Sequence, residues 1–122
     1  GFGGHGHQVR DVLHVMDLFD LITLQLGKLE VASQGVWNVG GGAGNAIALK
    51  ELSHACATRS GKSIDIAANP DTNPADIPWF ITDAGRVEQS FGWRPERSID
   101  ALLDDIFEWL TSERATLEPI LT

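Results

Sequence analysis

Apolar residues recur at helical spacing over residues 15–26 and form one broad hydrophobic face. Gly27 follows directly, and glycine is typical of the position just after the end of a helix. Residues 8–13 alternate in part between polar and apolar side chains, which is typical of a short strand. The pattern therefore predicts a strand that is followed at once by an amphipathic helix.

The rest of the chain alternates between extended and helical patterns. Its segments predict a buried strand at 35–39, a glycine-rich loop at 40–44, a helix at 46–60 capped by Asn45, a strand at 63–67, a loop at 69–78, a short strand at 79–81, a short helix from Thr82 or Asp83 to Phe91, and a helix at 99–111 capped by Ser98. This order predicts an α/β (α+β) fold with about four helices and a small mixed sheet of three to four short strands. We expect a single domain over residues 1–122 that begins with a flexible Gly/His-rich stretch at 1–7.

Composition excludes some partners. The formal net charge is −8, whereas nucleic acids and anionic membranes both select basic surfaces. A small anionic ligand is still allowed, because one well-placed arginine can bind a phosphate. Cys56 is the only cysteine, so we expect a reducing, cytoplasmic location and predict that this side chain is a small core hydrophobe. Because the first residue is Gly1 rather than methionine, we also expect a processed or shortened form of a longer protein.

Arg10 is the first candidate for binding chemistry, because it lies beside the predicted end of a strand. There its planar guanidinium could present paired donors to a phosphate or a carboxylate. The alternative is a structural ion pair with Asp11 or Asp17, and spacing alone favours this alternative.

The glycines of residues 40–44 lie between a predicted strand and a predicted helix, where phosphate-binding loops occur. Their spacing fits neither a Rossmann fingerprint nor a P-loop, so a turn that needs positive φ is the favoured interpretation.

Three histidines near the start of the chain, His5, His7 and His14, offer at most a weak metal site. We expect His14 to be packed or hydrogen-bonded instead. The acidic residues of the last helix, Asp104, Asp105 and Glu108, are predicted to form a solvated face rather than an acid–base pair.

Aromatic residues cluster after the proline-rich loop. Trp79 and Phe80 could stack a nucleobase or fill the core, and without further information the core is favoured. Trp93 is predicted to anchor the chain in the core before the last helix.

Four segments together resemble the extended short-chain dehydrogenase/reductases, the NAD-dependent nucleotide-sugar epimerases and dehydratases. They are Gln8 to Asp17 (QVRDVLHVMD), Val36 to Leu49, Asp71 to Asp83, and Phe91 to Pro95 with the helix after it. They cover nearly the whole chain in the family's order, and the first segment is most similar to the branch that contains CDP-paratose (CDP-tyvelose) 2-epimerase. The resemblance implies the C-terminal, substrate-binding part of a Rossmann-like enzyme.

Residue roles follow from this resemblance. Arg10 matches the arginine that binds the pyrophosphate of the nucleotide sugar, while Val12 and Ile47 match positions that line the nucleotide pocket. Asp76 matches an aspartate near the ribose, and Phe80 matches an aromatic residue beside it. Asn73 stands where the family usually has a second phosphate-binding arginine. A neutral hydrogen bond there is weaker by roughly half than a charge-assisted one, so the resemblance implies reduced affinity.

Catalytic parts of the family are missing from this sequence. It has no N-terminal dinucleotide fingerprint and no tyrosine, so the family's Tyr-x-x-x-Lys pair cannot lie within it. We therefore expect no catalytic residue, no bound NAD or metal, and no epimerase activity from this chain alone.

Three functional hypotheses remain open. The chain could be a nucleotide-sugar-binding domain with weak affinity for a nucleotide diphosphate sugar. Alternatively, it could be a non-enzymatic module that forms homo-oligomers and no longer binds nucleotide. A third reading has it complement a separate N-terminal cofactor domain.

Overall fold

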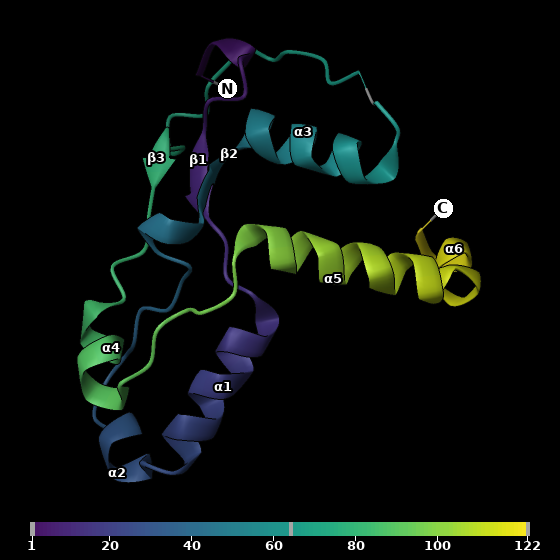
Figure 1. Cartoon of the computed structure of the whole chain (residues 1–122). Coiled ribbons are helices and arrows are strands. Elements are labelled where there is room, and N and C mark those ends of the chain that lie inside the picture. Colours follow the sequence, from purple (N-terminus) through teal and green to yellow (C-terminus); the bar gives the residue numbers. More distant parts are fainter. Residues whose placement is uncertain (1, 64, 122) are drawn as a thin grey trace.

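The computed structural model describes residues 2–63 and 65–121, and Figure 1 shows a small central sheet with helices spread around it. The elements in chain order are β1 (Val9–Asp11), α1 (Val15–Leu26), α2 (Leu29–Ala32), β2 (Ala46–Ala48), α3 (Leu49–Ser60), β3 (Trp79–Phe80), α4 (Gly85–Phe91), α5 (Ile99–Ser112) and α6 (Arg114–Leu121). Two 3₁₀ turns lie at Phe2–Gly4 and Ala43–Asn45. The predicted α/β class is confirmed.

The sheet has the order β2-β1-β3, with β1 in the middle. β2 runs antiparallel to β1, and β3 runs parallel to it. The predicted mixed sheet is therefore confirmed, although each strand is only two or three residues long. Because β1 has a neighbour on both sides, its side chains occupy the centre of both faces.

A small apolar core lies between α1 and α4. It consists of Leu21, Ala84, Val87, Phe91 and Trp93. Trp37 packs edge-on against Phe91, with 5.1 Å between the ring centroids. The expected anchor role of Trp93 is confirmed, because only 4% of its surface is exposed.

Polar contacts fix the start of α1 and join it to the chain that leads into α5. The side chain of His14 accepts a hydrogen bond from the backbone N–H of Met16 and so caps the helix. Asp17 is 1% exposed and accepts hydrogen bonds from both the backbone and the guanidinium of Arg97. The indole of Trp93 donates to the Asp17 carbonyl at 2.9 Å. These contacts determine where α5 leaves the core.

A guanidinium joins α3 to α5. Arg59 of α3 donates to Asp100 at 2.8 Å and to Asp104 at 2.7 Å. Hydrogen bonding to these two carboxylates raises the pKa of the Arg59 guanidinium above its ordinary value. None of the described helices is long and apolar enough to cross a membrane.

Several predicted helices match the structure closely. The helix predicted at 15–26 is α1, and Ser98 caps α5 by accepting from the Ala101 N–H at 3.2 Å. The short helix ends at Phe91 as predicted, but its N-cap is Ala84 rather than Thr82 or Asp83, and Asp83 accepts a hydrogen bond from the Gly85 N–H just ahead of the helix. Local apolar spacing and capping residues determine these elements, and the sequence shows both directly.

Other predictions were wrong. Residues 35–39 do not form a strand, since none of the described strands pairs with them, and Val36 is 84% exposed. Trp37 is held by its side chain instead, with the Arg86 guanidinium 4.6 Å from its ring centroid. Cys56 is exposed rather than part of the core.

The second helix also begins later than predicted. Residues 46–48 pair with β1 and so form a strand, and the helix starts at Leu49. Asn45 does not cap this helix, because its side-chain amide donates to the Arg97 carbonyl at 2.9 Å. Of the strand predicted at 63–67, residue 64 lies outside the described residues and the others have no strand partner.

Candidate functional site

One face of the sheet brings three sequence-predicted site residues into a row. Arg10 in β1 lies directly opposite Ile47 in β2 and directly opposite Phe80 in β3. Residues directly opposite one another in neighbouring strands point to the same face. The guanidinium is therefore flanked by one aliphatic and one aromatic side chain. The sequence favoured a core position for Phe80. This prediction was wrong, because 48% of the Phe80 surface is exposed.

The Arg10 guanidinium is paired with Asp76, which lies in the loop before β3. One NH2 hydrogen bond reaches Asp76 Oδ1 at 3.1 Å and another reaches the Ile77 carbonyl at 2.9 Å. NH1 donates to the Val9 carbonyl at 2.7 Å. The ion pair that spacing suggested with Asp11 or Asp17 is thus wrong, because a residue 66 positions along the chain takes that place. The side chains of Arg10 and Asp76 are 41% and 36% exposed, so both face solvent.

Gln8 belongs to the same cluster, although sequence reasoning did not select it. Its side-chain amide donates to Asp76 Oδ2 at 2.6 Å. Alternation along β1 could have indicated this position, since Gln8 and Arg10 are two residues apart and share a face.

A hollow of about 340 Å³ adjoins the cluster at Gln8. It is formed by the N-terminal segment, the start of α3 and the loop before β3, and its lining includes Gln8, Leu49, Lys50, Ser53 and Ile66. Leu49 and Ile66 give it an apolar floor, while the other three side chains add polar groups. The candidate site therefore combines an exposed guanidinium with an apolar recess beside it.

Two further predicted residues lie at the margins. Asn73 uses its side-chain oxygen locally, accepting from the Ala75 N–H at 2.9 Å, and its carbonyl accepts from the Asp76 N–H. It shapes the turn that leads to Asp76. Val12 is half-buried just beyond β1, where its N–H donates to the Asn45 carbonyl at 3.0 Å. The structure thus gathers Arg10, Ile47, Asp76 and Phe80 and leaves Asn73 and Val12 at the edges.

The glycine-rich loop is a structural turn. Gly42 has φ +67°, and its N–H donates to Asp11 Oδ2 at 2.9 Å. A Cβ on Gly40 would lie 2.3 Å from Thr82 Oγ1, and one on Gly41 would lie 1.8 Å from the Val12 carbonyl oxygen. Glycine is therefore required here by close backbone packing and by positive φ, as the favoured interpretation held.

Asp11 connects this loop to the strand before α4. Burial by itself would raise the pKa of the Asp11 carboxyl, but the hydrogen bonds that it accepts from Gly42 and Thr82 outweigh burial and lower its pKa below the ordinary value. The carboxylate is thus stabilised in its charged form, and it serves the fold rather than the Arg10 cluster.

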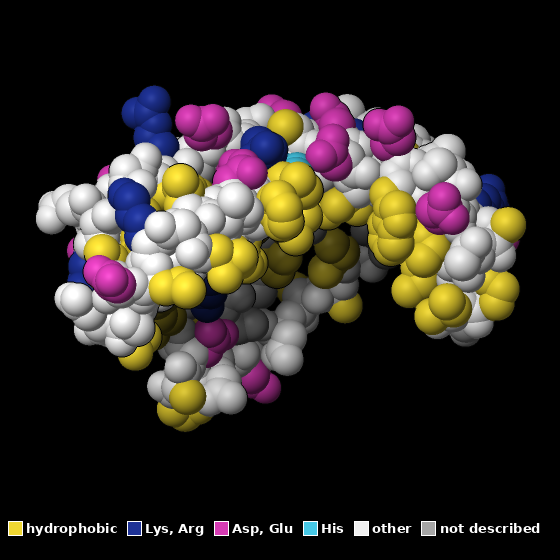
Figure 2. Space-filling view, turned by 90° about the horizontal axis from the view of Figure 1, so that it is seen from below, with side chains coloured by type: hydrophobic (Ala, Val, Ile, Leu, Met, Phe, Trp, Pro, Cys, Tyr) yellow, Lys and Arg dark blue, Asp and Glu magenta, His cyan; other side chains and the backbone are white. Residues whose placement is uncertain are grey.

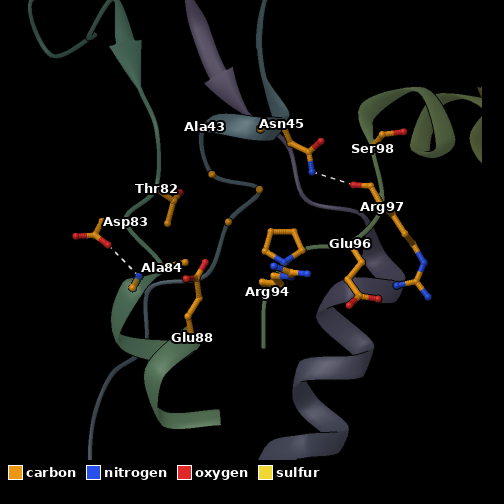
Figure 3. Close-up of a pocket in the computed structure, with 16 residues that line it drawn as sticks. Ala43, Asn45, Thr82, Asp83, Ala84, Glu88, Arg94, Glu96, Arg97 and Ser98 are labelled. Atoms are coloured by element: carbon orange, nitrogen blue, oxygen red, sulfur yellow. Dashed lines mark hydrogen bonds between the residues drawn. The ribbon is translucent and has the colours of Figure 1, made fainter. Parts of the chain in front are cut away.

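A second cavity, of about 550 Å³, lies on the other side of this loop and is shown in Figure 3. Its charged lining consists of the carboxylates Asp83, Glu88 and Glu96 and the guanidiniums Arg94 and Arg97. Arg97 is already bound to Asp17 and Asp20. The cavity therefore has more carboxylates than guanidiniums that could meet a ligand. Because carboxylates repel a negatively charged pyrophosphate, the glycine loop beside this cavity does not fit the pyrophosphate of NAD.

Other candidates from the sequence have structural roles in the described part of the chain. Arg59 pairs with Asp104, and Arg86 lies over the ring of Trp37, so both are engaged away from the Arg10 cluster. His14 is 4% exposed and lies 3.0 Å from an oxygen of Asp105, which confirms the prediction of a hydrogen-bonded histidine. No group of three or more metal-binding side chains occurs among residues 2–63 and 65–121.

No family model matches the chain. The UDP-glucose 4-epimerase of Drosophila melanogaster is 29% identical over 105 residues, which are 85% of this chain and 30% of that protein. The CDP-paratose 2-epimerase of Salmonella typhi is 27% identical over 116 residues, which are 89% of this chain and 32% of that protein. These identities do not separate the two types of epimerase, so the likeness to the CDP-paratose branch stays a prediction.

Solved structures agree with the sequence comparison. The dTDP-glucose 4,6-dehydratase of Bacillus anthracis in complex with NAD matches 95% of this chain with a TM-score of 0.72 and 26% identity. This chain covers 35% of that protein. The match is thus to the C-terminal third of larger proteins, and the chain spans about 30% of the length of its curated relatives.

Proposed function

The chain is related to the C-terminal part of the extended short-chain dehydrogenase/reductases, the nucleotide-sugar epimerases and dehydratases, and we propose that it is a nucleotide-sugar-binding domain of this kind. The observation that carries the proposal is the exposed Arg10 guanidinium between Ile47 and Phe80, with an apolar hollow beside it. UDP is bound in the solved UDP-glucose 4-epimerase of Bifidobacterium longum, which is 26% identical to this chain.

Each part of the cluster has a chemical role in this proposal. A guanidinium binds a phosphate through charge-assisted hydrogen bonds, and a diphosphate would meet the Arg10 donors that the contact with Asp76 leaves outward-facing. Asp76 would accept a hydrogen bond from a ribose hydroxyl. Ile47 and Phe80 would contact the apolar faces of the nucleoside. The role proposed for this chain is binding rather than proton transfer, because its sequence has no tyrosine to serve as the family's proton-transferring residue.

Calorimetry with UDP and CDP tests this proposal through Arg10→Ala. We expect the variant to bind either nucleotide about 10- to 100-fold more weakly than the wild type, because hydrogen bonds to a charged group contribute about 1.5–3 kcal/mol. Arg114→Ala is the matched control, since this residue pairs with Glu118 on the surface of α6. Equal affinities of the wild type and Arg10→Ala would contradict the proposal, as would the absence of any heat signal from the wild type.

An exposed apolar surface favours the second candidate function, which is self-association. On α1, Val15, Phe19 and Ile22 are 69%, 57% and 44% exposed. Figure 2 shows hydrophobic side chains gathered across this lower face and continuing to the far end of α5 and α6. Exposed apolar surfaces of this kind typically mark interaction sites.

Sedimentation at increasing concentration tests self-association. We expect the wild type to form dimers or larger oligomers, and we expect Phe19→Glu to remain monomeric because a carboxylate cannot be buried without a partner. Glu108→Ala removes a charge from the polar side of α5 and should leave the association unchanged. A wild type that stays monomeric at high concentration would rule out this function.

A further inference from the structure

Gln8 occupies a central place in the Arg10 cluster but has no assigned role. Its backbone is fixed in the sheet region, because its carbonyl accepts a hydrogen bond from the Leu49 N–H at 3.0 Å. Gln8 lies just before β1, and its side chain reaches Asp76, which lies 68 residues further along the chain. The hydrogen bond therefore connects a rigid position to a residue of a long loop.

The Asp76 carboxylate is divided between two partners. Its Oδ2 accepts from the Gln8 amide at 2.6 Å, and its Oδ1 accepts from the Arg10 guanidinium at 3.1 Å. A hydrogen bond from the Ile77 N–H to Oδ1, also at 3.1 Å, adds a contact from the loop itself. Because the bond from Gln8 to Oδ2 restricts rotation of the carboxylate, Gln8 contributes to where Oδ1 meets Arg10.

The orientation of Arg10 determines which of its donors face outward. Both hydrogens of NH2 are used by Asp76 and Ile77, and one hydrogen of NH1 is used by Val9. A guanidinium has five N–H donors. Among residues 2–63 and 65–121, the hydrogen bonds described here use three of them, and the second NH1 hydrogen and the Nε–H remain. These two donors could meet a phosphate without first breaking the contact with Asp76.

We propose that Gln8 is a positioning residue, which holds Asp76 so that the Arg10 guanidinium is kept in one orientation for a nucleoside diphosphate. The part that concerns the ligand rests on the proposed nucleotide-binding function. The part that concerns Arg10 is a property of the unliganded chain. An alternative is that Gln8 only ties the loop to the sheet, in which case its loss changes stability and leaves Arg10 unaffected.

The test measures the side chain of Arg10 directly by ¹⁵N NMR, with Arg10→Lys used to assign its signals. In the wild type we expect slow rotation about the Nε–Cζ bond and separate NH1 and NH2 signals. Gln8→Ala should give measurably faster rotation, because the contact of NH2 with Asp76 is loosened while the bonds to the Val9 and Ile77 carbonyls remain. His7→Ala, at an exposed neighbouring position, is the matched control and should retain the slow rotation of the wild type.

A double variant restores the hydrogen bond between positions 8 and 76 with the amide and the carboxylate exchanged. In Gln8→Glu with Asp76→Asn, the new carboxylate at position 8 accepts from the new amide at position 76, whose oxygen still accepts from Arg10. The net charge is unchanged. We expect slow rotation to return in the double variant but not in Gln8→Glu alone, where two carboxylates repel each other. A residue that only tied the loop would not produce this pattern.

Binding of UDP, measured by calorimetry, completes the test. One neutral hydrogen bond corresponds to roughly a three- to tenfold change in affinity, so Gln8→Ala should bind UDP about three- to tenfold more weakly than the wild type. An unchanged rotation rate about the Nε–Cζ bond in Gln8→Ala, or averaged NH1 and NH2 signals in the wild type, would overturn the positioning role whether or not UDP binds. A wild type that shows slow rotation but binds no nucleotide would support the positioning of Arg10 and refute the proposed function.

Discussion

Gly41→Ala is expected to destabilise the folded chain by about 3 kcal/mol or more, because the new methyl group has no space. Its Cβ would lie 1.8 Å from the carbonyl oxygen of Val12 and 2.8 Å from the Cβ of Asn45. The carbonyl is part of the backbone just after β1, so it cannot move aside without disturbing the sheet. Urea unfolding followed by circular dichroism measures the change.

Gly44→Ala is the matched control in the same loop. A Cβ at Gly44 would meet no heavy atom within 4 Å. The substitution should therefore change the free energy of unfolding by less than about 1 kcal/mol, and it could stabilise the chain by restricting the unfolded state. If the two variants unfold at the same urea concentration, the close approach of the loop to Val12 does not contribute to stability.

Asp17→Ala should cost about 1–3 kcal/mol, because a buried carboxylate that accepts hydrogen bonds is lost, while the Arg97 guanidinium stays partly exposed and keeps Asp20 as a partner. The Asp17 side chain is 2% exposed and accepts hydrogen bonds from both the backbone and the guanidinium of Arg97. Its loss leaves the Arg97 N–H without this acceptor and opens a small cavity at the start of α1. Because the segment after Trp93 is held through these bonds, α5 should also become less well ordered. Thermal unfolding and hydrogen exchange of α5 amides measure both effects.

Asp20→Ala separates burial from charge. Asp20 also pairs with Arg97, at 2.8 Å, but its side chain is 50% exposed. Exposed ion pairs contribute about 0–1 kcal/mol, so the free energy of unfolding of this variant should be close to that of the wild type. If both variants lose the same free energy, the charge of the pair rather than the burial of Asp17 stabilises this junction.

The glycine loop and Asp11 position the candidate site. The glycine loop brings residues 46–48 back beside β1, which places Ile47 opposite Arg10. Asp11, whose carboxylate binds both Gly42 and Thr82, fixes the same loop against the chain that follows β3. The residues that hold the sheet together thus differ from the residues that we expect to meet a ligand.

Much of the helical structure was predictable, since it depends on neighbours in the chain. Apolar spacing and the following glycine determined α1 to the residue, and the serine before Ile99 located the start of α5. Trp93 was identified as a core residue because a large aromatic side chain beside Arg94-Pro95 marks a fixed turn. The resemblance of four segments to a known family pointed to Arg10, Ile47, Asp76 and Phe80 before any of them could be placed in space.

The strands depended on contacts that the sequence does not show. An alternating pattern only permits a strand, whereas a hydrogen-bonded neighbour is needed to form one. Residues 35–39 have the composition of a buried strand but gain no such neighbour among the described strands, while residues 46–48 pair with β1 and so delay the start of α3. The exposure of Cys56 was missed for a related reason, since α3 packs through only part of its surface.

By itself, the sequence determined α1 and α5, the Ser98 cap, the family resemblance and the absence of a catalytic tyrosine, because these depend on residue identity and local spacing. Only the tertiary structure decided that Arg10 pairs with Asp76 rather than with Asp11 or Asp17, and that Gln8 holds the same carboxylate. These partners are 66 and 68 residues apart, and a parallel strand pair brings them together. Long-range pairing of strands therefore decided the chemistry of the site.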